Sequence, residues 1–121
     1  FVYEDETVVA FLDINPVNKG HILVVPKKAF NNIFDGNEET FAHMATIAMR
    51  LGNALKKSLG CDGVSIHMNN VIGQDVPHAH IHVIPRYESE KEPKITWSNK
   101  EEYAEDESAQ VATQIVAALE E

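Results

Sequence analysis

Cysteine, basic residues and long apolar runs are all scarce in this chain. The single cysteine, Cys61, excludes an internal disulfide and a Cys-x-x-Cys zinc site within these residues. Only 10 Lys and Arg stand against 19 Asp and Glu, and the net charge of −9 argues against long nucleic acids and anionic membranes as partners. Small nucleotides stay compatible with this charge, because they need only local positive groups. The longest apolar stretches, such as "HILVVP", have strand length rather than membrane-spanning length.

The composition is typical of one soluble globular domain, with 121 residues of which 44% are hydrophobic and 24% charged. The first residues, "FVYEDETVV", contain neither a basic segment nor an apolar stretch of the signal-peptide kind, so we expect a cytoplasmic protein. Along the chain we expect a core over about residues 1–86, a polar linker over 87–97 and a C-terminal helical segment over 98–120.

Apolar runs bounded by turn residues predict the strands. "FVYE" reads as a short edge strand, and "VVAFLD" and "HILVV" read as two antiparallel strands joined by the turn-forming "INPVNKG". Farther along, "VSIHM" predicts a strand that turns Val64, Ile66 and Met68 toward the core. The loop "NNVIGQ" then leads into a last strand.

Helical periodicity occurs in two segments. From Glu38 to Leu59 apolar residues recur at spacings of three and four, with Asn37 or Asp35 as the N-cap and Gly60 as a left-handed stop. Near the C-terminus Ser98 and Glu101 have the spacing of a capping box. Apolar residues behind them predict a closing helix: Tyr103, Val111, Ile115 and Leu119.

This order of elements predicts an α+β fold. We expect a single five-stranded, largely antiparallel sheet with one long central helix and a C-terminal helix. A sheet of this size has exposed edges and gains by pairing with a second copy, so we also expect a homodimer.

The segment "PHAHIHVIPR", residues 77–86, carries the strongest functional signal. Alternation along a strand places His78, His80 and His82 on one face and the apolar residues between them on the other. The three rings would span about 13 Å, which suits a row of contacts to an elongated anionic ligand and is too long for one metal ion. Pro85 is expected to close the strand, and Arg86 to offer a positive fork for phosphate or carboxylate.

Stability gives no reason to gather three imidazoles on one face, since they repel when protonated and gain no burial when neutral. Metal binding is the alternative for a His-x-His pair. The isolated histidines, His21, His43 and His67, are interpreted first as ordinary solvated or hydrogen-bonded side chains.

Taken together, "GQDVPHAHIHVIPR" resembles the signature of the histidine triad superfamily. "VVAFLDINPVNKGHILVVPKK" is similar to the first hairpin of that family, and "TWSNKEEYAEDE" to a C-terminal segment of its prokaryotic members. The resemblance implies a homodimeric α+β fold and a nucleotide hydrolase or transferase. Such enzymes act on the α-phosphate of nucleoside phosphoramidates or dinucleoside polyphosphates, with a purine nucleotide as substrate and no cofactor.

The same resemblance implies a role for each matching residue. His80 would attack the α-phosphorus and form a nucleotidyl-imidazole, while His78 and His82 orient it, bond phosphoryl oxygens and supply a proton. The residues implied in substrate binding are Asp13 at the ribose hydroxyls, Gln74 on the phosphate side, Asn69 or Asn70, His21 beside the triad, and Ile14.

Three departures from the family pattern matter. Asp75 stands where Ser or Thr is usual, and an ionised carboxylate donates no hydrogen bond. The loop "NNVIGQ" is short and lacks the Gly usual after its Asn. Ala29 replaces a histidine that helps bind structural zinc in many bacterial members, so we expect no zinc in these residues. Two alternatives stay open: a nucleotide-binding regulatory or interaction protein with weak turnover, and a His-rich metal-binding module.

Overall fold

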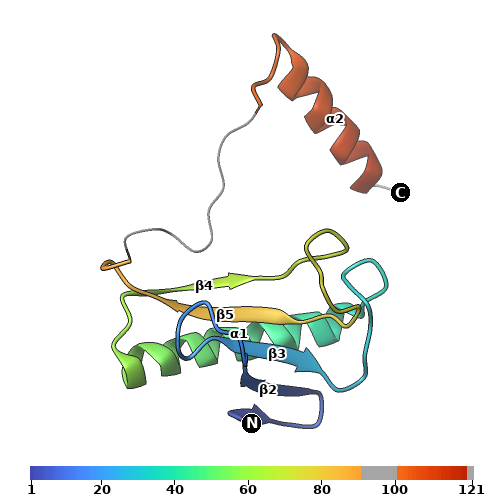
Figure 1. Ribbon diagram of the computed structural model, residues 1–121. Helices are drawn as coiled ribbons and strands as arrows, with labels where there is room; N and C mark the ends of the chain where they lie inside the picture. The colour runs from blue at the N-terminus through green and yellow to red at the C-terminus, as the bar shows by residue number, and fades with distance from the viewer. Residues whose placement is uncertain (91–100, 120–121) are drawn as a thin grey trace.

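The fold is an antiparallel sheet with one long helix across it (Figure 1). The computed structural model describes residues 1–90 and 101–119. The elements follow in the order β1 (Tyr3–Glu4), β2 (Val8–Leu12), β3 (Ile22–Pro26), α1 (Glu38–Leu59), β4 (Gly63–His67), β5 (Ile81–Arg86) and α2 (Glu107–Leu119). All strand pairs are antiparallel and the sheet order is β1-β2-β3-β5-β4. The predicted α+β class and the five-stranded sheet are confirmed.

Helix α1 begins and ends where local chemistry dictates. The side chain of Asn37 accepts a hydrogen bond from the Thr40 amide at 3.0 Å, so Asn37 rather than Asp35 is the N-cap. Gly60 takes the left-handed conformation at φ 66° and ends the helix. Within the helix, a Cβ at Gly52 would lie 3.3 Å from a Val64 methyl, so the glycine permits a close approach to β4.

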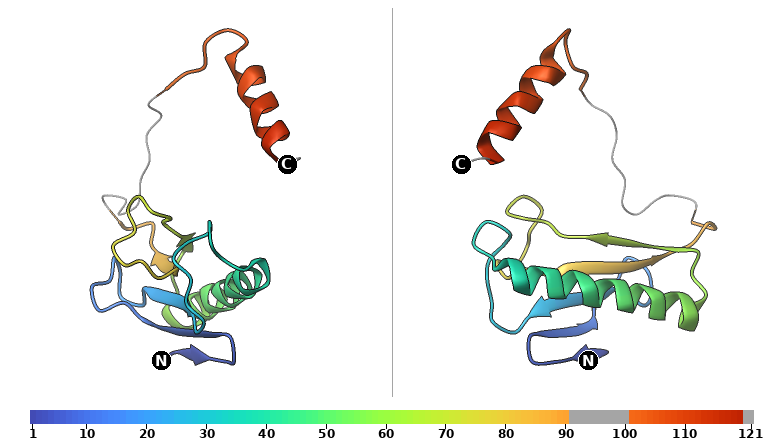
Figure 2. Two further views of the ribbon diagram at one scale, coloured as in Figure 1. Left: turned by 90° about the vertical axis from the view of Figure 1, so that its right-hand side faces the viewer. Right: turned by 180° about the vertical axis from the view of Figure 1, so that it is seen from behind.

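The hydrophobic core lies between α1 and one face of the sheet, as the views in Figure 2 show. Alternate residues of β2, β3 and β5 point into it, because successive side chains of a strand face opposite sides. They meet the buried stripe of the helix. The core residues are Val8, Ala10, Ile22, Val24, Met44, Ile47, Ala48, Leu51, Leu55, Cys61, Ile81 and Val83.

The histidine segment differs from its predicted strand at both ends. β5 begins only at Ile81, so His78 and His80 precede the strand, although Ala79 is fully buried and the alternation continues through it. At the other end, β5 runs through Pro85 instead of stopping there. β3 pairs with β5 only as far as Val83, so the missing amide of Pro85 removes no bond to β3.

Val64 and Ile66 point to the helix side of the sheet, as predicted, because Ile66 stands opposite the core residue Val83 and Val64 approaches Gly52 of α1, but neither residue is buried. Their side chains are 38% and 49% exposed. The reason is the position of β4 at the edge of the sheet: α1 lies mainly over β3 and β5, so the core-facing side of β4 overhangs the helix. An apolar strip is left open along this edge.

The C-terminal helix also differs from the prediction. α2 begins at Glu107, behind an irregular stretch that includes Tyr103, and none of its residues is buried. It therefore does not close over the core (Figure 1). Ser98, half of the predicted capping box, lies outside the described residues. In the described ranges, neither helix combines the length and the apolar character that a membrane crossing needs.

Candidate functional site

Four imidazoles gather on the sheet face that α1 leaves open. The ring centroid of His82 lies 5.1 Å from that of His21, 4.5 Å from that of His67 and 4.9 Å from that of His80. The rings come from different segments: the turn before β3, the last residue of β4, and the start of β5. His82 is the centre of this cluster, because its ring contacts all three of the others.

A chain of hydrogen bonds fixes the tautomer of His82. The backbone amide of Val17 donates to Nδ1 of His21 at 3.1 Å, so the ring proton of neutral His21 must sit on Nε2. That Nε2 lies 2.9 Å from Nδ1 of His82 and donates to it. Neutral His82 then carries its own proton on Nε2, where it is available as a donor.

The tautomer of His80 is set by a main-chain group. Its Nδ1 lies 2.8 Å from the carbonyl oxygen of His78. A carbonyl oxygen only accepts, so Nδ1 carries the proton and the neutral ring keeps a lone pair on Nε2. His78 thus orients His80 through its backbone. Its own ring donates from Nε2 to the carbonyl oxygen of Pro26 at 3.2 Å.

Burial keeps three of the four rings, those of His82, His21 and His67, uncharged at neutral pH. Desolvation is the largest cause that lowers the pKa of His82, to about 4, and the neighbouring imidazoles lower it further against the opposing charge of Asp13. Burial likewise lowers the pKa of His21, which is 3% exposed, and that of His67. The hydrogen bonds of neutral His21 and His82 described above are therefore the ones present at pH 7.

An apolar pocket of about 290 Å³ adjoins the cluster. Its walls are outward-facing residues of β2 and β3, one apolar residue of the loop before the histidines, and two of the histidines themselves. These residues are Phe11, Leu23, Val25, Val76, His78 and His80. Sequence reasoning missed the four apolar members and also His67. Strand alternation indicates that Phe11 and Leu23 oppose the core, but only the register of the sheet brings them to His80.

Two of the predicted substrate-binding residues lie in the turn after β2. Asp13 accepts a hydrogen bond from the Asn15 amide through Oδ1 at 2.9 Å, and its Oδ2 lies 3.7 Å from Nε2 of His21. The carboxylate therefore both forms the turn and faces the imidazole cluster. The side chain of Ile14 is 92% exposed and does not line the apolar pocket.

The other predicted residues lie in the loop of residues 69–74, where their side chains bond backbone groups. Asn69 donates to the Gly73 carbonyl at 3.1 Å, and Asn70 accepts from the Ile33 amide at 2.8 Å. Gln74 accepts from the Val71 amide at 2.9 Å and donates to the carbonyl oxygen of Asn31.

Asn70 and Gln74 thus hold the loop of residues 69–74 against that of residues 31–35, whereas the Asn69 bond lies within the first loop. Asp75 is exposed at the end of the first loop.

Arg86 does not serve the histidine cluster. Its Nε and Nη2 each lie 3.0 Å from an oxygen of Glu90, so its positive fork holds a carboxylate of its own chain. Asn18 bonds the same carboxylate at 3.0 Å. The Arg86 hydrogen bond, with those of the Tyr87 amide and Asn18, lowers the pKa of Glu90 to about 2.

One group in the described ranges has the composition of a metal site: Asp13, His21 and His82, whose ligand atoms lie within 4.8 Å of one another. A metal at Nε2 of His21 would require the ring proton to move to Nδ1, but Nδ1 already accepts from Val17. Histidines that bind a metal normally donate a hydrogen bond from their second nitrogen. The hydrogen bond that Nδ1 of His21 accepts from Val17 therefore opposes a cation here. The zinc set of bacterial relatives does not fit either, because Ala29 has no ligand atom.

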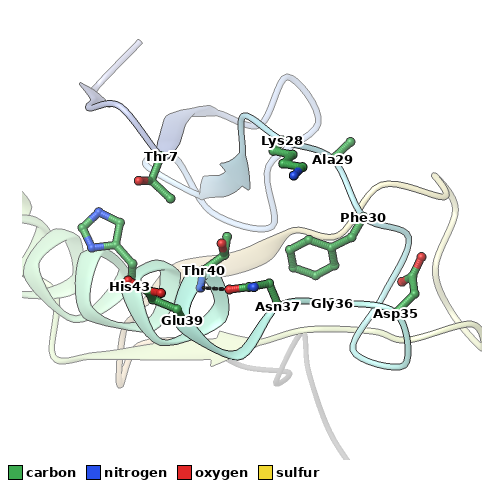
Figure 3. A pocket seen from close by; sticks show the side chains of 10 residues that line it. All are labelled: Thr7, Lys28, Ala29, Phe30, Asp35, Gly36, Asn37, Glu39, Thr40 and His43. Atoms are coloured by element: carbon green, nitrogen blue, oxygen red, sulfur yellow. Dashed lines mark hydrogen bonds between the residues drawn. The ribbon is translucent and has the colours of Figure 1, made fainter.

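A larger pocket, of about 760 Å³, opens at the start of α1 (Figure 3). It is lined by residues of the segment after β3 and of the first helical turns, and it contains none of the clustered imidazoles. His43 at its rim bonds Asp5 at 2.6 Å, as expected for an ordinary hydrogen-bonded histidine. Volume alone does not supply a nucleophile, so the histidine cluster is the candidate site.

Comparisons with known proteins identify the family of the chain. The HIT domain family matches residues 1–89. An uncharacterised HIT-like protein of Methanocaldococcus jannaschii is 50% identical over 93 residues, which are 75% of this chain and 71% of that protein. The adenylylsulfatase HINT3 of Arabidopsis thaliana is 34% identical over 101 residues, 82% of this chain and 49% of that protein.

Among solved structures, that of SMU.412c from Streptococcus mutans is similar with a TM-score of 0.88 at 35% identity, covering 98% of this chain and 75% of that chain. The chain belongs to the HIT domain family, as its sequence predicts. At the level of the superfamily, membership supports a nucleotide-binding hydrolase or transferase.

Proposed function

We propose that this protein hydrolyses or transfers the nucleotidyl group of a purine nucleoside phosphoramidate or dinucleoside polyphosphate through a covalent nucleotidyl-His80 intermediate. One observation carries the proposal: the hydrogen bond from Nδ1 of His80 to the His78 carbonyl at 2.8 Å. It leaves the Nε2 lone pair of a neutral imidazole free, beside an apolar pocket and a ring that offers an Nε2–H. A nucleophile and a donor thus stand together on the open face.

The chemistry divides into two displacements. Nε2 of His80 bonds the α-phosphorus as the bond from phosphorus to the leaving group breaks, and water then attacks the same phosphorus and frees the imidazole. His82 holds its Nε2 proton for a phosphoryl oxygen or for the leaving group, since its Nδ1 is occupied by His21. The apolar pocket would take the flat base, and the Oδ2 side of Asp13 the ribose hydroxyls.

The decisive experiment is a hydrolysis panel of adenosine phosphoramidates, lysyl-adenylate, dinucleoside polyphosphates and adenylyl sulfate, the last because a relative is an adenylylsulfatase. His80→Ala should lower turnover of the preferred substrate by about 10³-fold or more while nucleotide binding stays within about tenfold, since a covalent nucleophile acts mainly in the transition state. His43→Gln, which changes a histidine outside the cluster, is the matched control. A His80→Ala enzyme with near wild-type turnover would rule the mechanism out.

Ribose recognition can be tested in the same assay. Hydrogen bonds to a carboxylate are worth about 1.5–3 kcal/mol each, so a 2′-deoxy substrate should lose roughly 10- to 100-fold in kcat/KM. Asp13→Ala should abolish that penalty. A deoxy penalty that survives in Asp13→Ala would leave the carboxylate with its turn role alone.

A second candidate is a nucleotide-binding regulatory protein with weak turnover. Asp75 favours it, because this exposed carboxylate has no proton to give a leaving group where relatives carry a hydroxyl. Tight nucleotide binding without multiple turnover across the whole panel would favour this function over catalysis.

We also propose a homodimer formed along the edge of β4. Val64 and Ile66 are partly exposed there, and Met49 of α1 is 61% exposed across a small groove from them. A two-fold mate would cover this apolar strip and pair the free edge of the strand. Light scattering at micromolar concentration should give the mass of two chains, and Ile66→Asp should reduce it to one.

A further inference from the structure

His67 is a titratable residue of the cluster for which the proposed mechanism has no use. It is the last residue of β4 and stands directly opposite His82 in the antiparallel register of β4 and β5. Its ring stacks on that of His82 with centroids 4.5 Å apart and planes inclined by 14°. This is the closest and most nearly parallel of the ring contacts that His82 makes.

Stability does not account for a histidine at this position. Nδ1 of His67 is buried and makes no hydrogen bond within the described residues. A buried polar atom without a partner destabilises a fold, and an apolar side chain of similar size would remove that penalty. What the residue does provide is a flat ring face against His82.

His82 needs such a face. Its hydrogen bond from His21 holds Nδ1, but one hydrogen bond leaves a ring free to swing about the bonded atom. His80 meets the ring edge-on, with planes inclined by 66°, and so offers no parallel surface. The stacked ring of His67 limits rotation out of plane, which is the motion that would turn the Nε2–H of His82 away from the substrate.

We propose that His67 is a positioning residue that acts through His82: its stacked ring fixes the plane of the His82 imidazole and so aims the Nε2–H of His82 at the reacting phosphoryl group. This inference rests on the proposed function for its catalytic consequence, but the ring geometry is independent of any substrate. The stack requires that the two rings are not both protonated, because two imidazolium ions face to face repel. Burial, which lowers the pKa of both rings, meets this requirement at neutral pH. The titratable groups around the stack are His21, His80 and Asp13.

The test compares two substitutions at one position. His67→Phe keeps a flat ring without nitrogen, and His67→Leu removes the ring. Ser65→Ala, two residues earlier on the same face of β4, is the control. We expect His67→Leu to lower kcat about tenfold or more, because small misplacements of a catalytic group are costly, with KM within about twofold. His67→Phe should keep kcat within about threefold of wild type, and neither variant should melt below it.

Long-range ¹⁵N–¹H spectra of the His82 ring give a readout that needs no activity. All three proteins should show the Nε2–H tautomer that His21 imposes, with narrow ring signals in wild type and His67→Phe and broadened ring signals in His67→Leu, whose His82 ring plane is no longer fixed.

Unchanged kcat and spectra in His67→Leu would overturn the proposal, as would an equal loss of kcat in His67→Phe, which would assign the role to a nitrogen of His67. If the wild type turns over none of the substrates, the mechanism fails while the spectra still decide the positioning role.

Discussion

The two faces of the sheet are made by the same strands and are held by different forces. Under α1, alternate residues such as Val24 and Val83 are fully buried in an apolar core. On the other face, the alternating residues of β3 and β5 are imidazoles and apolar side chains, of which Leu23 and Val25 are half-buried and Ile84 is buried, and specific hydrogen bonds set the positions of the imidazoles. The core therefore anchors each histidine indirectly, because it buries the residues next to that histidine in the chain.

The largest effect on stability should come from a substitution in the core between α1 and the sheet. Met44 is fully buried at the contact between α1 and the sheet, so Met44→Ala should lower the free energy of unfolding by about 2–5 kcal/mol. Urea unfolding measures this loss. The substitution lies outside the imidazole cluster, so kcat of the folded fraction should stay near that of wild type.

Phe11→Ala is the matching change on the open face. Phe11 is only half buried and lines the apolar pocket beside His80. It should cost clearly less stability than Met44→Ala and weaken nucleotide binding more. If both variants lost stability equally, the open face would be a second structural core and not a ligand surface.

An intermediate effect should appear when the pH is lowered. The folded-state pKa of His82 is about 4, below its ordinary value of 6.5, so the unfolded chain takes up the proton first. The contribution of His82 to stability is complete above about pH 6.5 and is lost as the pH falls toward 4. Urea midpoints at a series of pH values should show this fall for wild type and for His43→Gln.

His82→Asn should show a smaller fall, because that variant has no proton to take up at position 82. The residual slope then reports His21 and His67, whose pKa values are also lowered. An identical slope in wild type and His82→Asn would show that the open face is better solvated than its hydrogen bonds indicate.

The smallest effect concerns the rim of the open face. Val71 has φ 74°, a left-handed conformation that β-branched residues strongly disfavour. Val71→Gly should relieve this strain and raise the free energy of unfolding by about 0.5–1 kcal/mol after the greater freedom of the unfolded chain is counted. Ile72→Gly, at an exposed neighbour without positive φ, should give no gain. A loss of stability in Val71→Gly would mean that side-chain contacts of Val71 outweigh the strain.

Local chemistry made much of the fold predictable. The bounds Glu38–Leu59 follow from Asn37, Gly60 and the apolar period between them, and the helix has those bounds. The burial of Ala79, Ile81 and Val83 follows from strand alternation. Alternation also gives the helix-side orientation of Val64, but not its 38% exposure, because alternation does not reveal whether a helix covers that part of the sheet.

The candidate site was predictable only in its sequence motif. The His-x-His-x-His pattern indicates His80, but the contact of His67 with His82 depends on the register between β4 and β5, which no local pattern contains. The partner of Arg86 was missed for a different reason: Glu90 is only four residues away, and the turn between them sets the contact. Long-range pairing is the information that the motif lacks.

The amide of Val17 makes the hydrogen bonding of the imidazole cluster robust to mutation at position 17. The backbone amide of Val17, acting through His21, places the ring proton of His82 on Nε2. No side-chain group of residue 17 takes part. Every amino acid except proline supplies that amide, so drift at position 17 leaves the tautomers of His21 and His82 intact as long as the turn keeps its shape. Selection is therefore expected to act on the conformation of the turn that contains residue 17, and hardly at all on the identity of that residue.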